Sequence, residues 1–205
     1  MNHSLSPVFV IDDDVSVRRS LARMLTNEGY AVETFDSGSA YLDRAAPGGA
    51  ACVVLDVRMP GLNGLELQQA LAALGREDQI IFITGHGDVP MCAQAMKAGA
   101  ADFLPKPFTG EALLSAVAQA LQRVHAWQQK HAVREGARAQ VALLSPRELE
   151  VFRHLIAGLL NKQIGAALGT AEKTVKVHRG HITAKLGIAS VAGMVRLAQQ
   201  AGVNP

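Results

Sequence analysis

The sequence has few of the residues that build disulfide-stabilised or membrane proteins. Its 205 residues include two cysteines, Cys52 and Cys92, which are too few for a disulfide framework. We interpret both as buried, reduced thiols, which favours the cytosol. No run of about 18 apolar residues occurs, so we expect no membrane contact. The first seven residues carry neither the basic nor the apolar segment of a signal peptide, so the predicted location is cytoplasmic.

The small net charge of +2 conceals an uneven distribution along the chain. Residues 1–120 contain 14 acidic and 8 basic side chains, whereas residues 121–205 contain 4 acidic and 12 basic ones. The first part therefore carries −6 and the second +8. Apolar residues make up 49% of the chain, which excludes a disordered protein. At roughly 150 residues per domain the length allows two small domains, of which the basic one is expected to bind a polyanion.

Short apolar runs alternate with helical patterns in the first part. Five runs of strand-forming residues are predicted to be strands, at residues 8–11, 31–35, 51–55, 80–83 and 102–104. Strands that alternate with helices predict βαβ units and a parallel sheet. Uniformly apolar strands suit a sheet that is covered on both faces. We therefore expect residues 1–120 to form an α/β domain with a doubly wound, five-stranded parallel sheet.

Polar side chains follow the predicted strands at the edge where such a sheet binds its ligands. Asp12 and Asp13 follow the first strand, Asp56 the third and Lys106 the fifth, while Thr84 follows the fourth. Carboxylates this close need a counter-charge, and carboxylates with water suit Mg²⁺. Lysine and metal can neutralise a transferring phosphoryl group, which the hydroxyl can hold. Asp56 stands singly at the end of the central strand, so we expect it to be the nucleophile that forms an aspartyl phosphate.

Each of these residues also has an ordinary structural interpretation. An aspartate after a strand is often only a helix cap, which is the role that we expect for Asp14. Thr84 alone would be a turn residue, and Lys106 alone would be a solvated lysine. The combination at successive strand ends favours the chemistry. We interpret His86, which lies between two glycines, as a loop residue rather than a metal ligand or phosphoryl relay.

Four segments of this part resemble the receiver domain of two-component response regulators, namely VIDDD at 10–14, LDVRMPG at 55–61, TGHGDVPM at 84–91 and KPF at 106–108. The resemblance covers about residues 7–120, is greatest to the FixJ-like group, and implies a flavodoxin-like fold. It implies that Asp56 accepts phosphate from a sensor histidine kinase and that Lys106 pairs with that phosphate. It also implies a Mg²⁺ site formed by Asp12, Asp13, Asp56 and the backbone carbonyl of Arg58.

The same resemblance implies a conformational switch. Thr84 and Phe103 are its switch pair, and the Lys106–Pro107 bond is expected to be cis. When Thr84 moves to the phosphate, Phe103 can fill the vacated space, which alters the face of the fourth helix, fifth strand and fifth helix. We expect phosphorylation to favour a homodimer through that face, whose predicted apolar residues are Met91, Met96, Ala98 and Ala101.

The second part of the chain is predicted to be helical throughout. Residues 121–142 are expected to form a helical linker. Ser145, Pro146 and Glu148 then have the spacing of a capping box with proline at the first helical position. Three further helices are predicted at about residues 161–168, 172–186 and 191–201. A short helix, a glycine-containing turn and a second helix indicate a helix-turn-helix, so residues 143–205 are expected to form an all-α, four-helix domain.

The helix predicted at residues 172–186 has two different faces. At 100° per residue, three apolar side chains point to the core, namely Val175, Ile182 and Leu186. Four residues point the opposite way, namely Lys173, Val177, Gly180 and Ala184. A basic face of small residues can enter the major groove of DNA. An ordinary amphipathic helix with a solvated lysine face explains the pattern equally well, but the charge of +8 and the preceding short helix favour DNA.

Three segments of this domain resemble the LuxR-type DNA-binding domain, namely LSPRE at 144–148, GLLNKQIG at 158–165 and TVKVH at 174–178. The resemblance covers about residues 143–203. It implies that Lys176 and Val177 contact bases or phosphates, that Lys173 contacts the DNA backbone, and that double-stranded DNA and RNA polymerase are partners. We expect Arg179 to reach a phosphate along the edge of the helix. The family often has a polar residue where Gly180 stands, so a contact there is not assigned.

The predicted function is a phosphorylation-switched transcription factor rather than an enzyme. One alternative is an aspartate-based phosphohydrolase, but such enzymes usually have a second carboxylate two residues after the nucleophile, where this chain has Arg58. Another alternative is a receiver whose output domain binds protein or RNA. Footprinting on duplex DNA separates that alternative from the preferred one.

Overall fold

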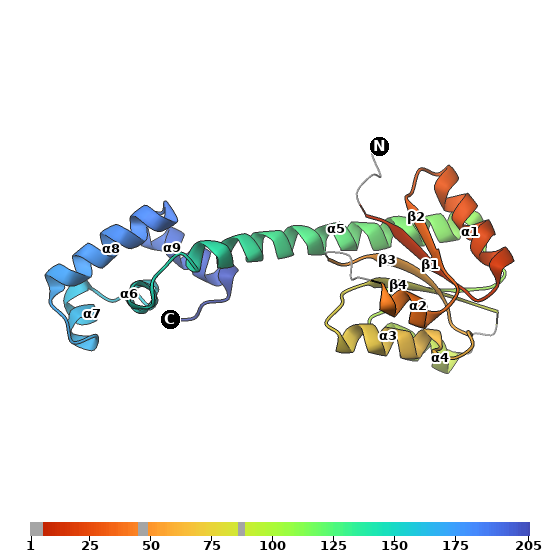
Figure 1. The fold of residues 1–205 in the computed structure, drawn as a ribbon, viewed down its shortest axis with the longest axis horizontal. Helices are drawn as coiled ribbons and strands as arrows, with labels where there is room; N and C mark the ends of the chain where they lie inside the picture. The colour runs from red at the N-terminus through yellow and green to blue at the C-terminus, as the bar shows by residue number, and fades with distance from the viewer. Residues whose placement is uncertain (1–5, 45–48, 86–88) are drawn as a thin grey trace. The chain divides into compact units, whose positions relative to one another are not determined.

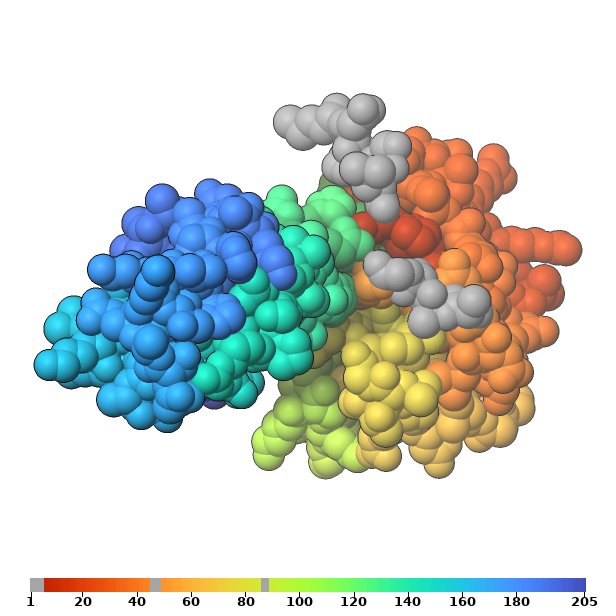
Figure 2. All heavy atoms as spheres, turned by 60° about the vertical axis from the view of Figure 1, so that its left-hand side comes forward, coloured from red at the N-terminus to blue at the C-terminus, as the bar shows by residue number. Residues whose placement is uncertain are grey.

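The computed structural model describes residues 6–44, 49–85 and 89–205. The chain divides into two compact units, Met1–Gln128 and Gln129–Pro205, which are drawn as a ribbon in Figure 1 and as spheres in Figure 2. Among the described residues, no helix has the length and apolar character needed to cross a membrane.

The N-terminal unit contains the five-stranded parallel sheet that the sequence predicts. Its strands lie in the order β2-β1-β3-β4-β5, and every neighbouring pair is parallel. Their bounds are β1 Val8–Ile11, β2 Val32–Phe35, β3 Cys52–Asp56, β4 Gln79–Thr84 and β5 Asp102–Pro105. The order reverses between β1 and β3, so the carboxyl ends of these two strands form the switch point where such sheets bind ligands.

Five helices cover the two faces of this sheet (Figure 1), namely α1 Val15–Asn27, α2 Gly38–Asp43, α3 Gly64–Ala73, α4 Val89–Lys97 and α5 Gly110–Val141. Alternate strand residues enter two separate cores. Val54 packs with residues of α1 and α5 on one face, and Val53 packs with residues of α2, α3 and α4 on the other. The doubly wound α/β fold is thereby confirmed. Cys52 is buried as predicted, but Cys92 is only half-buried, since it lies on α4.

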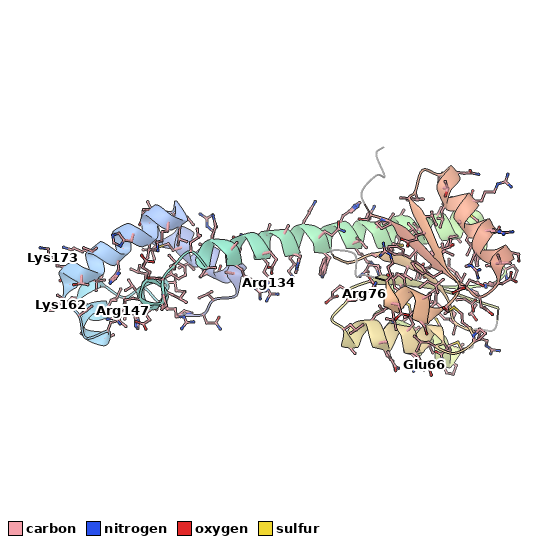
Figure 3. All side chains as sticks on the ribbon, in the orientation of Figure 1. Glu66, Arg76, Arg134, Arg147, Lys162 and Lys173 are labelled. Carbon is pink, nitrogen blue, oxygen red and sulfur yellow. The ribbon has the colours of Figure 1, made fainter. Side chains whose placement is uncertain are left out.

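The C-terminal unit contains the four predicted helices, namely α6 Pro146–Ile156, α7 Asn161–Ala167, α8 Glu172–Leu186 and α9 Val191–Ala201. The predicted capping box begins α6, where Ser145 and Glu148 each bond the other's backbone N–H and Pro146 occupies the first turn. The helices enclose one apolar core. Figure 3 draws their side chains and labels three basic ones, Arg147 on α6, Lys162 on α7 and Lys173 on α8.

Helix α5 runs without a break for 32 residues and contributes to both cores. Leu113 and Val117 belong to the core beneath α1, whereas Ala137 and Val141 belong to the core of the C-terminal unit. Gln128 donates hydrogen bonds to Ser6 Oγ at 3.3 Å and to the carbonyl of Ala50 at 3.4 Å. The side chains of this helix are therefore divided between the two units near residue 128.

Candidate functional site

Two buried carboxylates share one lysine at the carboxyl ends of β1, β3 and β5. Lys106 Nζ lies 2.8 Å from Asp56 Oδ1 and 3.0 Å from Asp12 Oδ2. Asp56 is 6% exposed and Asp12 1% exposed. Parallel strands bring these residues together because each of the three strands ends at the same edge of the sheet.

Backbone N–H groups hold the two carboxylates in place, and one arginine holds the backbone of the loop after β1. The N–H of Arg58 donates to Asp56 Oδ2 at 2.7 Å, and the N–H of Asp14 donates to Asp12 Oδ1 at 2.9 Å. The guanidinium of Arg18, on α1, donates to the backbone carbonyls of Asp12 and Asp13 at 2.6 and 2.9 Å. Sequence reasoning did not find Arg18, since its position in the helix gives no sign of what its side chain reaches.

The start of α3 lies against the backbone of Asp56. A Cβ placed on Gly64 would come within 2.6 Å of the Asp56 carbonyl oxygen and 3.1 Å of the Phe82 ring. Glycine at this position therefore allows the close approach of helix and strand. The carboxylate of Asp14 accepts hydrogen bonds from the backbone of Ser16 and Val17, which confirms its predicted role as the cap of α1.

The electrostatics of the pair follow from its burial. Burial raises the pKa of Asp56 in spite of the hydrogen bond and positive charge of Lys106, and the neighbouring Asp12 contributes to the rise. Burial alone would lower the pKa of Lys106, but its hydrogen bonds to Asp56 and Asp12 outweigh burial, and its pKa is raised. Two carboxylates against one ammonium leave an excess of negative charge that a cation can compensate.

The third acidic residue stands apart from this pair. Asp13 is exposed and lines, together with Arg58, Asn63 and Met91, a groove of about 520 Å³ beside the pocket. Within the described residues, no three His, Cys, Asp or Glu side chains are arranged to hold a metal ion. The available donors are nevertheless all oxygens, which are the ligands that a hard cation such as Mg²⁺ takes.

The remaining residues predicted for the pocket lie at the ends of β4 and β5. Thr84 is the buried last residue of β4, and its carbonyl accepts a hydrogen bond from the N–H of Lys106 at 2.7 Å. Phe103 is half-buried, and its ring centroid lies 6.3 Å from that of Phe82. The Lys106–Pro107 bond is cis, as predicted. The prediction for His86 lies outside the described residues.

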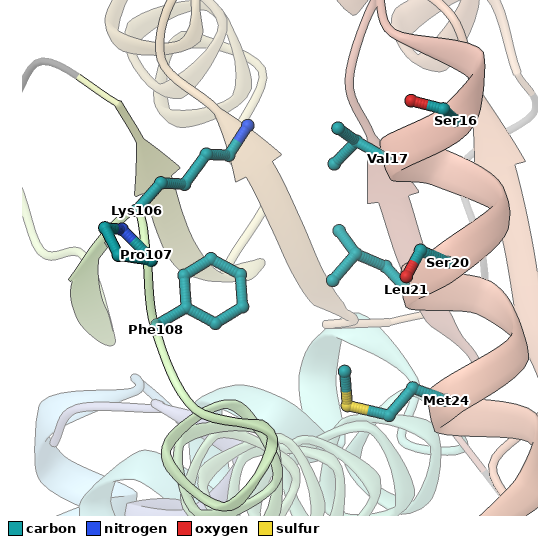
Figure 4. Close-up of a pocket in the computed structure, with 8 residues that line it drawn as sticks. All are labelled: Ser16, Val17, Ser20, Leu21, Met24, Lys106, Pro107 and Phe108. Atoms are coloured by element: carbon teal, nitrogen blue, oxygen red, sulfur yellow. The ribbon is translucent and has the colours of Figure 1, made fainter.

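A second groove of about 380 Å³ opens from Lys106 along α1. Figure 4 shows the side chains of Val17, Leu21 and Met24 projecting from α1 toward Phe108. The Lys106 side chain is 28% exposed, whereas both of its carboxylate partners are buried. The pocket is therefore accessible from solvent at its lysine.

The predicted faces of α8 agree with the burial of its side chains. Val175, Ile182 and Leu186 are buried in the core of the C-terminal unit. The four residues predicted to point the opposite way are all exposed, namely Lys173, Val177, Gly180 and Ala184. Val177 is 51% exposed although it is apolar. Helix α8, in medium blue, contributes to the surface of its unit in Figure 2.

Two basic residues of α8 are bound by the neighbouring helices. Arg179 Nη1 donates to Asn161 Oδ1, on α7, at 2.6 Å, and Lys185 Nζ lies 2.6 Å from Glu148 Oε2, on α6. Lys176 lies 3.9 Å from Glu172 in a largely exposed pair. Lys173 extends from the same end of the unit as Lys162 (Figure 3). No role is predicted for Lys162 from the sequence. This end therefore carries positive charge on two helices.

Comparison with known proteins identifies a family for each of the two units. The response regulator receiver domain family matches residues 8–118, and the luxR family of bacterial regulatory proteins matches residues 142–198. Nodulation protein W of Bradyrhizobium diazoefficiens is 44% identical over 96% of this chain and 87% of its own length. The transcriptional regulatory protein FixJ of Azorhizobium caulinodans is 45% identical over 97% of this chain and 94% of its own.

Among solved structures, the low-resolution structure of the response regulator StyR is 46% identical. The match covers 96% of this chain and 100% of the StyR chain, with a TM-score of 0.84. FixJ is a transcriptional regulatory protein and the luxR family consists of bacterial regulatory proteins, which sets aside the phosphohydrolase alternative. Receiver domains in general use Mg²⁺ for phosphorylation by a sensor kinase, and luxR-type domains bind DNA. The chain belongs to the two-component response regulators, as a FixJ-like member with a receiver domain and a LuxR-type DNA-binding output domain.

Proposed function

We propose that Asp56 is the phosphoacceptor through which a sensor histidine kinase controls DNA binding by this regulator. The observation that carries the proposal is the shared lysine: Lys106 Nζ contacts both Asp56 Oδ1 and Asp12 Oδ2 at the end of the sheet. A positive charge at that point can receive a phosphoryl group on Asp56.

The transfer step uses the Asp56 carboxylate as nucleophile. One of its oxygens attacks the phosphorus of a phosphohistidine, the P–N bond breaks, and its electron pair returns to the histidine ring of the kinase. An aspartyl phosphate results, and Lys106 neutralises charge on its oxygens. The hydroxyl of Thr84, the last residue of β4, is proposed to bind one of those oxygens.

Asp12, Asp13, Asp56 and the backbone carbonyl of Arg58 are proposed to hold Mg²⁺. When bound, the metal supplies positive charge that stabilises the transferring phosphoryl oxygens. The support is the oxygen donor set and the excess of negative charge around Lys106. Asp13 and Arg58 line one groove, so both can face an ion there.

Thr84 and Phe103 are proposed to pass the signal to a dimer surface on α4, β5 and α5. Phe103 packs against the core that includes Phe82 and Ala95, so its displacement would disturb α4. Val89 and Met96 expose apolar surface on α4, at 83% and 43%. Two residues predicted for this surface do not belong to it fully, since Met91 and Ala101 pack against the two cores.

Lys173, Lys176, Val177 and Arg179 are proposed to contact DNA, with α8 in the major groove. Lys173, Lys176 and Val177 are exposed, as a contact with DNA requires. Arg179 is half-buried and bonded to Asn161, so it can offer its remaining guanidinium donors to a phosphate only beside α7. RNA polymerase is proposed as the partner of the DNA-bound form.

Residues 1–120 are proposed to be the receiver domain, 121–142 a helical linker and 143–205 the DNA-binding domain. Residues 121–141 of this linker are helical in the structure, within α5, and Ala142 follows in a turn. Trp127 and Gln128 lie close to Gly49 and Ala50, whereas Ala137 and Val141 are buried with α6 to α9. The two ends of the linker therefore pack within different units.

Gel shifts on genomic DNA fragments test the proposed function as a whole. We expect acetyl phosphate with Mg²⁺ to increase the affinity of the full-length protein for its fragments, and sedimentation to show a dimer under the same conditions. Phosphorylation of the protein with unchanged affinity and a monomer throughout would contradict the proposed switch. Binding to RNA but not to duplex DNA would favour the alternative output domain.

Lys176 and Val177 are expected to contribute to DNA binding in different ways. Lys176→Ala should weaken binding and reduce the log–log salt slope by about 0.9, because one phosphate contact is lost. Val177→Ala should leave that slope unchanged but reduce discrimination between selected and mismatched sites by about 1 kcal/mol, because an exposed valine can contact a thymine methyl group. A salt titration and a competition assay on both variants measure these effects. If Val177→Ala alters neither affinity nor preference, α8 is not docked by this face.

A further inference from the structure

Gly180 lies in the interior of α8, on the surface that points away from the core. Its φ is not positive, so no left-handed turn requires a glycine there. A Cβ built on Gly180 meets no atom within 4 Å, so no neighbouring group requires a glycine either. Glycine in a helix interior is less stable than alanine, because it loses more backbone freedom on folding. The protein alone therefore gives no reason for a glycine at this position.

Most other glycines of the C-terminal unit do have a structural reason, either crowding or a positive φ. A Cβ on Gly165, in α7, would lie 2.8 Å from the Thr170 carbonyl oxygen, and one on Gly193, in α9, would lie 2.6 Å from Ile188 Cγ2. Four more have a positive φ, namely Gly158, Gly169, Gly187 and Gly202. Within residues 129–205, all of which the structure describes, only Gly136 and Gly180 have neither crowding nor a positive φ.

Two long side chains near Gly180 are bound to neighbouring helices. Arg179 is bonded to Asn161 at 2.6 Å, and Lys185 is paired with Glu148 at 2.6 Å. One turn before Gly180, Val177 presents a short apolar side chain to solvent. The backbone of α8 is consequently uncovered at Gly180, between residues that belong to the proposed DNA-binding face.

We infer that Gly180 is the point at which α8 approaches DNA most closely, and that the missing side chain lets a DNA group contact the helix backbone. This inference rests on the proposed function of α8 in DNA binding. A methyl group at this position would occupy the space of that DNA group and hold the helix away from the groove. With glycine at this position the free protein is less stable than it would be with alanine, but α8 can lie closer to DNA.

Gly180→Ala tests the inference because stability and affinity should change in opposite directions. The urea midpoint of the C-terminal unit, followed by amide hydrogen exchange of the full-length protein, should rise by about 0.3–1 M. Affinity should fall at least about fivefold, as for a methyl group forced into a packed contact. The probe is a duplex carrying the sequence that the wild-type protein selects from a randomised library, with acetyl phosphate and Mg²⁺ present.

Gly136→Ala is the matched control, since it also replaces an uncrowded helical glycine of the same unit. It should raise the urea midpoint and leave the affinity unchanged. An equal or higher affinity of Gly180→Ala would overturn the inference, as would a lower urea midpoint or an equal loss of affinity in the control. Failure of the wild-type protein to select any duplex would instead contradict the proposed function itself.

Discussion

Asp56→Asn is expected to abolish incorporation of acid-stable, base-labile phosphate from acetyl phosphate or a sensor kinase. The substituted amide keeps the shape of the side chain but is not a nucleophile near neutral pH. Among the described residues, Asp12 is the one other carboxylate paired with Lys106. Omission of Mg²⁺ should also prevent labelling of the wild-type protein, because the metal compensates the charge of the pocket. Labelling of the variant at the wild-type level would contradict the assignment.

The same substitution is expected to stabilise the N-terminal unit. Burial raises the pKa of Asp56, so its ionised form is less favourable in the folded than in the unfolded chain. A raised pKa means that this cost is absent below the ordinary value of 3.8 and appears as the pH rises through the raised one. Asp56→Asn should therefore unfold at higher urea than the wild type near neutral pH, and the difference should disappear in acid.

Trp127 is the single tryptophan of the chain and lies in the N-terminal unit, so its fluorescence reports this transition. Asp36→Asn is the matched control, because Asp36 also follows a strand of the sheet but is exposed, whereas Asp56 is buried. We expect the control to keep both the phosphate incorporation and the urea midpoint of the wild type. A midpoint of Asp56→Asn that falls at neutral pH would show that the ion pair with Lys106 outweighs the cost of burial.

The sequence predicts the pocket as far as strand ends determine it. Asp56 ends β3 and Lys106 follows β5, and the parallel order alone brings them to one edge. Asp13 also follows β1, but it lies two residues beyond the end of that strand, and the structure leaves its side chain exposed in the neighbouring groove. The contact of Arg18 with the carbonyls of the loop after β1 depends on a side-chain conformation that neither periodicity nor composition indicates.

In the C-terminal unit, helix bounds and buried faces follow from local signals. The capping box at Ser145 begins α6, and the 100° projection separates the buried Val175 from the exposed Val177. What this pattern leaves out is the link between helices. Glu148 and Lys185 are 37 residues apart, so helical periodicity, which relates residues within one helix, gives no sign that they meet.

Glu148→Ala is expected to destabilise the C-terminal unit by about 2–3 kcal/mol, because a cap and a charged hydrogen bond are lost together. Glu148 is 4% exposed, and its carboxylate accepts from the N–H of Ser145 at 2.8 Å and from Lys185 Nζ at 2.6 Å. The expected loss of stability is no larger because the Lys185 side chain is 41% exposed and solvent screens its charge. Amide hydrogen exchange over α6 to α9 in urea measures the change. Freed from α6, α8 should also bind DNA more weakly.

The pH dependence of this effect separates the ion pair from the cap. The hydrogen bond from Lys185, followed by that from the Ser145 backbone, lowers the pKa of Glu148 from 4.5 to about 2. A lowered pKa means that the stabilisation is present above pH 4.5 and is lost as the pH falls toward 2. Glu148→Gln, which keeps an acceptor for Ser145 but carries no charge, should lack this dependence.

Glu150→Ala provides the reference for both measurements, since Glu150 pairs with Arg147 at 2.6 Å on the exposed side of the same helix. An exposed pair contributes little, so the control should lie within about 0.5 kcal/mol of the wild type. His181 Nδ1 also lies 3.8 Å from Glu148 Oε1. If Glu148→Ala is as stable as Glu150→Ala between pH 5 and 7, the carboxylate does not hold α8 to α6, and the orientation of α8 depends on its apolar core alone.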